Sequence, residues 1–393
     1  MPTELAPASA DEILTALIRR AFPFAAPPPL PPQRQTPDAW ETLVARARYH
    51  GLVPLLCAAL DAQPRDDVTE AQHSALTDAY RSSALACATK YHELNAVLAQ
   101  ARAQTLPLVL LKGAALAQWL YPAPALRPFG DTDVLLHQSD VPRLQALLET
   151  RGYHAHAELS KGFGDAYYSE MAFAQTTAPR LALDAHWHLF VPVYFRARMD
   201  IRWFWAHTQT FLINAQPVLI FDPTAQLLHL TIHASLNHRH SPRLLWLYDL
   251  ALLLTKHGDA IDWDDAARFA RASQVTRSVR EILEQTETRW GVCAPAPFLQ
   301  TLKNTRIGWS EHAAFALTAA EHNQARALSD ALATPGAMNK VRYAARHVFP
   351  DAAYMTEHYR VSHRALLPLY YARRVLETGW KFACSIVSAV ARK

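Results

Sequence analysis

Two aspartates stand two residues apart in the segment DTDVLLH, where Asp131 and Asp133 precede a run of apolar residues. Because alternate side chains of a β-strand leave the same face, this spacing places two carboxylates about 6 to 7 Å apart along the chain. Mg²⁺ prefers carboxylate oxygens together with substrate phosphates, and a pair of ions can hold both the attacking and the leaving oxygen of an in-line displacement. The pair therefore indicates a metal site, although acidic residues also cap many strands that bind no metal.

A third carboxylate is usually needed in such a site, to complete the metal shell and to orient or deprotonate the attacking hydroxyl group. Asp184 in RLALDAHWHLF is the candidate, because it lies in a second strand-like run with His186 and His188 on the same face. We expect Asp131, Asp133 and Asp184 to be both the metal ligands and the catalytic carboxylates. We expect His186 to lie near the site, although a purely structural hydrogen bond from its ring to a backbone carbonyl would explain its presence equally well.

A turn suited to phosphate lies upstream, where Lys112 and Gly113 separate the strand-like run LPLVLL from the helical run GAALAQWLY. A glycine at this point lets the backbone approach a phosphate, and a helix N-terminus offers unpaired N–H groups to an anion. Lys112 can supply a compact positive charge or merely close the strand edge. Arg127 can grip a phosphate with two nitrogens or pair with an acidic neighbour. One end of a short sheet thus gathers an anion-binding turn and three possible metal ligands.

The elements that position these residues alternate between strand and helix. The runs at residues 106–111 and 131–137 predict buried strands, and SDVPRLQALLETRG predicts a helix capped by Ser139. Three further strand-like segments come at about residues 153–158, 167–175 and 180–190. These patterns predict a compact α/β unit.

Helical patterns lie on both sides of that unit. A short helix at residues 10–21 precedes FPFAAPPPLPPQRQTP, in which seven prolines among sixteen residues exclude regular structure. We divide the chain into an N-terminal segment with this proline-rich connector, a helical region, an α/β domain and a C-terminal helical region, at residues 1–37, 38–104, 105–222 and 223–393.

Composition narrows the classes of function. The chain has 393 residues, half of them hydrophobic, and its 39 Lys and Arg against 35 Asp and Glu give a formal charge of only +4. This small excess, without a basic groove interleaved with aromatic residues, argues against a nucleic-acid partner. Four scattered cysteines with no CxxC pair argue against a disulfide framework or a thiolate zinc site, and fit a reducing compartment.

The two ends of the chain bear on its location. The N-terminus lacks a basic region followed by an apolar core, and no run of about 18 apolar residues occurs, so we expect a cytoplasmic protein. From Arg360 onward there are seven Lys or Arg against only Glu377. This aromatic, basic tail can form a helix docked on its own domain, which we favour, or a helix in peripheral contact with anionic lipid.

The order of these motifs carries a specific resemblance. The stretch from Leu106 to Tyr153, with LKG and then RP-x-x-D-x-D, is followed by LALDAHWHL and later by LLHLTIHASLNH and LLWLYDLALLL. Over roughly residues 75–260 this pattern resembles the uncharacterised nucleotidyltransferase family of the polymerase-beta-like superfamily. The resemblance implies an α+β fold, in which a minimal nucleotidyltransferase domain with a short mixed sheet is flanked by helical regions.

The resemblance also implies a reaction and roles for particular residues. The reaction would be transfer of a nucleoside monophosphate from an NTP such as ATP, with Mg²⁺ or Mn²⁺ as cofactor and release of pyrophosphate. Asp131 and Asp133 match the paired metal ligands, Asp184 the third carboxylate, and Gly113 the glycine of the phosphate-binding turn. Where the superfamily commonly has Gly or Ser, this chain has Ala114, so backbone N–H groups and Lys112 would hold the phosphate. The resemblance leaves open the acceptor, the preferred nucleotide and the oligomeric state.

Other interpretations of the same residues stay open. A metal-bound triphosphate also permits transfer of the γ-phosphoryl group, as in a kinase, and a catalytically silent nucleotide-binding or interaction module is a third possibility. His229 and His233 are four apart, but the sequence HLTIH lacks the glutamate of a zinc protease. With His238 and His240, they either pack the helical lobe or line the acceptor pocket. Asp249 either fixes a neighbouring Arg or His or contacts substrate.

Overall fold

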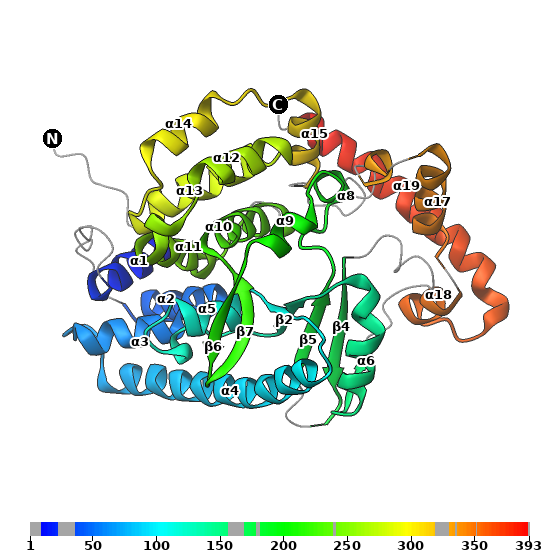
Figure 1. Ribbon diagram of the computed structural model, residues 1–393. Coiled ribbons are helices and arrows are strands. Elements are labelled where there is room, and N and C mark those ends of the chain that lie inside the picture. The colour runs from blue at the N-terminus through cyan, green and yellow to red at the C-terminus, as the bar shows by residue number, and fades with distance from the viewer. Residues whose placement is uncertain are drawn as a thin grey trace.

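The computed structural model describes residues 9–22, 36–155, 169–177, 181–238, 241–318, 330–334, 336–350 and 352–391 (Figure 1). Most of the proline-rich connector, residues 156–168 and 178–180, which include the ends of three predicted strands, and His240 lie outside these ranges. Seven strands of the described residues form one mixed sheet in the order β3-β4-β5-β2-β1-β7-β6. Helices flank this sheet, so the predicted α+β class is confirmed.

The first part of the chain is helical, as predicted. It contains α1 (Ala10–Ala21), α2 (Pro37–His50), α3 (Val53–Ala62) and α4 (Glu70–Ala103). Ser9 with Glu12 and Thr69 with Gln72 form capping boxes at the starts of α1 and α4, which satisfy backbone N–H groups that have no partner within the helix. Helix α2 ends where Gly51 adopts a left-handed conformation with φ of 74°.

The seven strands of the sheet all lie between helix α4 and the C-terminal helices in the sequence. Its strands are β1 (Val109–Leu110), β2 (Thr132–Leu135), β3 (Tyr153–Ala155), β4 (Glu170–Gln175), β5 (Ala182–His186), β6 (Thr208–Ile213) and β7 (Gln216–Phe221). Between them lie α5 (Lys112–Trp119), α6 (Val141–Glu149), α8 (Val193–Arg196) and α9 (Ile201–Ala206). Each of the five predicted strand segments contains one of the strands β1 to β5 within the described residues.

Two local features differ from the sequence-based expectation. Ser139 does not cap α6, because a 3-10 turn at Gln138–Asp140 precedes that helix and Pro142 starts its first turn. The hairpin of β6 and β7 was not predicted. It adds two strands to the sheet beyond β1 and pairs β7 in parallel with β1.

The remaining helices are α10 (Pro223–Ile232), α11 (Leu244–His257), α12 (Trp263–Ala272), α13 (Thr276–Trp290), α14 (Ala296–Asn304), α15 (Trp309–Thr318), α17 (Ala337–Val348), α18 (Ala352–Tyr359) and α19 (Leu367–Ala391). The basic tail forms α19, which contacts α17 and α18. Among the described residues, no helix combines the length and the apolar character that crossing a bilayer requires.

The two faces of the sheet pack on different helices. Leu110 and Val134 belong to a core shared with α4 and α6, whereas their neighbours Val109 and Leu135 belong to a larger core built mainly from α1 to α3 and α10 to α14. Alternate residues of a strand face opposite sides, so Asp133, two residues before Leu135, projects toward the larger helical layer. In Figure 1 this layer, with α10 and α11, covers the sheet on the side opposite α4.

Candidate metal centre

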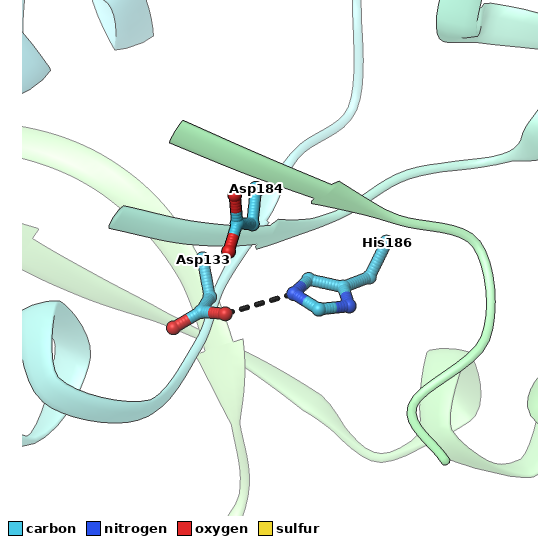
Figure 2. A group of neighbouring side chains, drawn as sticks. All are labelled: Asp133, Asp184 and His186. Atoms are coloured by element: carbon cyan, nitrogen blue, oxygen red, sulfur yellow. Dashed lines mark hydrogen bonds and ion pairs between the residues drawn. The ribbon is translucent and has the colours of Figure 1, made fainter. Parts of the chain in front are cut away.

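The parallel pairing of β2 with β5 brings two of the predicted carboxylates together. Asp133 is the register partner of Asp184, and Leu135 is the partner of His186. Side chains in register on neighbouring strands share a face, so Asp184 and His186 both lie beside Asp133 (Figure 2). Asp133, Asp184 and His186 each offer one ligand atom, and these atoms lie within 4.8 Å of one another. This group could hold a divalent metal ion.

Asp133 is the buried centre of the group. One of its oxygens, Oδ1, accepts hydrogen bonds from Lys112 Nζ at 2.6 Å and from His186 Nε2 at 2.8 Å. Burial on its own raises the pKa of Asp133, but the charge of Lys112 and the hydrogen bond from His186 outweigh it and hold that pKa well below its usual value. Asp133 is therefore ionised throughout the physiological pH range, as a metal ligand must be.

Asp184 has the opposite electrostatic character. Burial, followed by the charges of Asp133 and Asp131, raises the pKa of Asp184 to about 6. Two carboxylates that repel each other in a partly buried place are stabilised by a cation between them, which favours the ionised form of both. The electrostatics of the pair thus suit an acidic metal site better than a site that stays empty.

His186 lies between two carboxylates, because its Nε2 faces Asp133 and its Nδ1 lies 3.0 Å from Glu170 Oε2. Burial and the charge of Lys112 lower the pKa of His186, but its bonds to Asp133 and Glu170 leave that pKa raised overall. A histidine with a carboxylate at each nitrogen donates from both. In this arrangement His186 orients Asp133, and it can ligate a metal only after losing a proton.

Asp131 directly precedes β2 and is exposed. It is not part of the close group of three, but it lines the same cavity, and its charge raises the pKa of both Lys112 and Asp184. Asp131 therefore lies on the solvent side of the buried Asp133 and the half-buried Asp184. Its predicted role as a second metal ligand stays a prediction.

The predicted phosphate turn lies beside these carboxylates. Helix α5 begins at Lys112, which adopts a φ of 46°, a left-handed conformation that is uncommon for a residue with a side chain. A Cβ atom on Gly113 would lie 2.6 Å from Phe129 Cβ, so only glycine fits there. Lys112 and Gly113 line the cavity, whereas Ala114 is fully buried in the core and can reach a ligand only through its backbone.

Arg127 is placed in an ion pair with an acidic neighbour, which was one of its two predicted roles. Its Nε and Nη2 donate to Asp249 at 2.9 and 2.7 Å, and its Nη1 donates to the carbonyl of Pro128 at 2.8 Å. The Tyr121 hydroxyl also donates to Asp249, at 2.6 Å. Because all three nitrogens are engaged, a two-nitrogen grip on phosphate is unavailable in this arrangement. Arg127 instead fixes the turn that leads from Pro128 to Asp131.

The acidic group and the start of α5 open onto one cavity of about 1050 Å³. Its wall includes Asp131, Asp133 and Asp184 from the strand region and Lys112 and Gly113 from the start of α5. Pockets for a single small ligand usually measure about 300 to 1,000 Å³. The cavity therefore has room for a nucleotide and part of a second molecule.

A family model described as an uncharacterised nucleotidyltransferase matches residues 36–291, which is more than half of the chain. The chain belongs to this family. The matched region begins with α2, ends just after α13 and includes every residue of the metal centre. No curated protein and no solved structure matches the chain. Membership confirms the family resemblance drawn from the motifs, and the acidic group and the cavity are the features that fit a nucleotidyltransferase.

The histidine cluster of this family member lies on the helical side of the cavity. His233 begins a π-helical turn at His233–Asn237 and His238 directly follows it. Both histidines line the cavity, and their Nε2 atoms are 2.9 Å apart. His229 is buried against Phe190 and Phe221 and does not line the cavity. Of these three histidines, His229 therefore packs in the core, whereas His233 and His238 belong to the wall of the cavity.

Glu170 is the residue of this centre that the sequence did not reveal. It begins β4, and its register partner is His186 on β5. No local sequence pattern links Glu170 to the site, because only the antiparallel pairing of β4 with β5 brings its carboxylate to the second nitrogen of His186. A lone glutamate at a strand end carries no pattern of its own.

Proposed function

We propose that this protein transfers a nucleoside monophosphate from an NTP to an acceptor and releases pyrophosphate, using Mg²⁺ or Mn²⁺ held by Asp131, Asp133 and Asp184. The observation that carries the proposal is the pairing of Asp133 with Asp184 on neighbouring strands, in a cavity beside the N-terminus of α5. This arrangement supports the two-metal chemistry that the resemblance to polymerase-beta-like enzymes implies.

The chain's own residues would position the reactants. The unpaired N–H groups at the start of α5 and the charge of Lys112 would hold the phosphates, while Gly113 allows their close approach. The bound metal would supply neutralisation of the triphosphate and of the charge that develops during displacement.

The displacement itself is written as one exchange of bonds. An acceptor oxygen or nitrogen forms a bond to the α-phosphorus as the bond between that phosphorus and the bridging oxygen breaks, and the electron pair leaves with pyrophosphate. Asp184 takes up the acceptor's proton, directly or through water. Membership in the family leaves the acceptor open, whether small molecule, peptide or protein side chain.

The sharpest test is Asp184→Asn. Because burial and neighbouring carboxylates raise the pKa of Asp184, a neutral side chain relieves repulsion, and we expect the variant to be at least as stable as the wild type. We expect it to bind Mn²⁺ at least tenfold more weakly by calorimetry and to lose pyrophosphate release. Asp66→Asn, a change to an exposed carboxylate away from the cavity, is the matched control.

Activity can be measured without knowing the acceptor, by screening the four nucleoside triphosphates against fractions of cell extract for pyrophosphate. Full Mn²⁺ affinity and undiminished pyrophosphate release in Asp184→Asn would refute the proposal. Release of ADP in place of pyrophosphate would indicate γ-phosphoryl transfer, and failure of the wild type to bind Mg-NTP would indicate a silent module.

A further inference from the structure

The wall of the cavity is divided by charge. The carboxylates come from β2, the start of β4 and β5, whereas a second part of the wall comes from the end of α2 and the start of α11. This second part carries Arg48 and Arg243, and no carboxylate of the described residues pairs with either guanidinium. By contrast Arg46, two residues before Arg48, is held by Asp11 through two hydrogen bonds. Arg48 and Arg243 are thus cations of the cavity wall with unused donors.

The fold fixes the two helix ends that carry these arginines. His50, the last residue of α2, accepts a hydrogen bond at Nδ1 from the N–H of Leu244, the first residue of α11, at 3.1 Å. Gly51 packs so closely on α11 that an added Cβ would lie 3.0 Å from Leu245 Cδ2. The backbones next to Arg48 and Arg243 are therefore tied to each other.

Arg243 is also supported by aromatic rings. Its guanidinium carbon lies 5.8 Å from the ring centre of Tyr49 and 5.6 Å from that of Trp246, within the range of cation–π attraction. Both aromatic residues line the cavity. This support limits the conformations of the Arg243 side chain, so less entropy is lost when the guanidinium binds an anion.

The neighbouring histidines add another donor, because their hydrogen bonds define which nitrogen carries the proton. Asn237 Oδ1 accepts from the N–H of Val191 and its Nδ2 donates to a backbone carbonyl, so the same Nδ2 donates to His233 Nδ1. His233 then carries its proton on Nε2 and donates to His238 Nε2. Burial, with the charges of Lys112 and Arg243, lowers the pKa of His238 to about 4, so it is neutral near pH 7. Its proton must sit on Nδ1, which accepts nothing and can only donate.

We propose that Arg48, Arg243 and His238 form an oxyanion subsite that binds a phosphate or carboxylate group of the acceptor. The inference rests on the proposed function, in which the phosphates of the NTP occupy Lys112 and the start of α5. Hydrogen-bond donors predominate in this part of the wall, so it suits a negatively charged group whose oxygens accept hydrogen bonds. The volume of the cavity leaves room for such a group beside the nucleotide.

The test uses inorganic phosphate as the probe and ³¹P NMR as the readout, because this method separates free phosphate from the nucleotide signals. The full-length protein is first saturated with Mg²⁺ and a non-hydrolysable NTP analogue, which fills the nucleotide site. Phosphate is then titrated into the wild type, Arg48→Gln and Arg243→Gln. Arg306→Gln removes the same charge from an exposed arginine that does not line the cavity, and is the control.

We expect phosphate to bind the nucleotide-loaded wild type and the Arg306→Gln control alike. Arg48→Gln and Arg243→Gln should each weaken phosphate binding about tenfold or more, the usual order for a lost hydrogen bond to a charged group, with the affinity for the analogue changed less than about twofold. Absence of phosphate binding once the analogue is bound, equal phosphate affinity in wild type and variants, or a parallel loss of analogue affinity would each overturn the acceptor subsite. Failure of the wild type to bind the analogue would refute the proposed function itself, and the acceptor subsite with it.

Discussion

The buried ion pair between Arg127 and Asp249 yields a quantitative prediction. The side chain of Arg127 is 7% exposed and that of Asp249 is 0% exposed, and Asp249 also accepts the hydrogen bond from Tyr121. Asp249→Asn removes the negative charge and leaves the guanidinium buried without a counter-charge. Breaking a buried pair in this way typically costs about 3 to 5 kcal/mol. That loss is a large fraction of the roughly 5 to 15 kcal/mol by which native proteins are stable.

The assay is urea unfolding at pH 7, followed by tryptophan fluorescence. Asp78→Asn is the control, because Asp78 is 71% exposed in a pair with Arg81 at 3.6 Å, and exposed pairs contribute about 0 to 1 kcal/mol. The double variant Arg127→Met with Asp249→Leu replaces the pair by apolar side chains and should recover much of the stability lost in Asp249→Asn. A loss below about 1 kcal/mol in Asp249→Asn, or a double variant no more stable than the single one, would refute this account.

Two further predictions concern the phosphate turn and the buried histidine. Gly113→Ala should destabilise the protein by about 1 to 3 kcal/mol, because the new methyl group would lie 2.6 Å from Phe129 Cβ and force the turn apart. The variant should also bind Mg-NTP more weakly in calorimetry. Unchanged stability and binding would contradict the close packing. Burial lowers the pKa of His229 to about 3 in the folded protein, whereas the pKa in the unfolded chain is about 6.5. Between these values the unfolded state binds more protons than the folded state. The stability of the protein therefore falls as the pH drops below about 6.5. When the pH falls from 7 to 5, the free energy of unfolding of His229→Leu, measured with urea, should decrease by about 2 kcal/mol less than that of the wild type. Equal decreases in the two proteins would show that His229 is not buried in its neutral form.

The spacing of the acidic residues predicted which of their side chains share a face, because strand periodicity is a local property. Alternation in DTDVLLH assigned Asp133 to one face, and LALDAHWHL assigned Asp184 and His186 to one face. Their adjacency depends on the parallel pairing of β2 with β5, which no local pattern specifies. Their proximity was predicted from the need for a third carboxylate and then from the family resemblance, and the register of the strands gives its physical basis.

The β6–β7 hairpin shows where sequence patterns fail. Its two-residue turn consists of Asn214 and Ala215, with φ of 49° and 64°, and such turns are usually recognised by a glycine in the second position. Pro217 then stands within β7, where proline lowers the expectation of a strand. The sheet tolerates this proline because β1 pairs with β7 at Leu219, two residues further along, so Pro217 has a strand partner only on the β6 side, at Leu212.

The arrangement of charges explains why the acidic pair is better understood as a functional feature than as part of the packing. A core selected for stability alone has no reason to set Asp184 beside Asp133, because their repulsion and partial burial raise the pKa of Asp184 to about 6. The same core holds Lys112 in a left-handed conformation so that its amino group lies 2.6 Å from Asp133. His186 then bonds to the same Asp133 oxygen, and its other nitrogen pairs with the exposed carboxylate of Glu170. Each of these features lowers stability or requires a compensating partner, and all of them converge on one wall of the cavity. A divalent cation bound at the acidic pair would remove this repulsion, so the free energy that the repulsion costs in the free protein would add to the affinity for the metal.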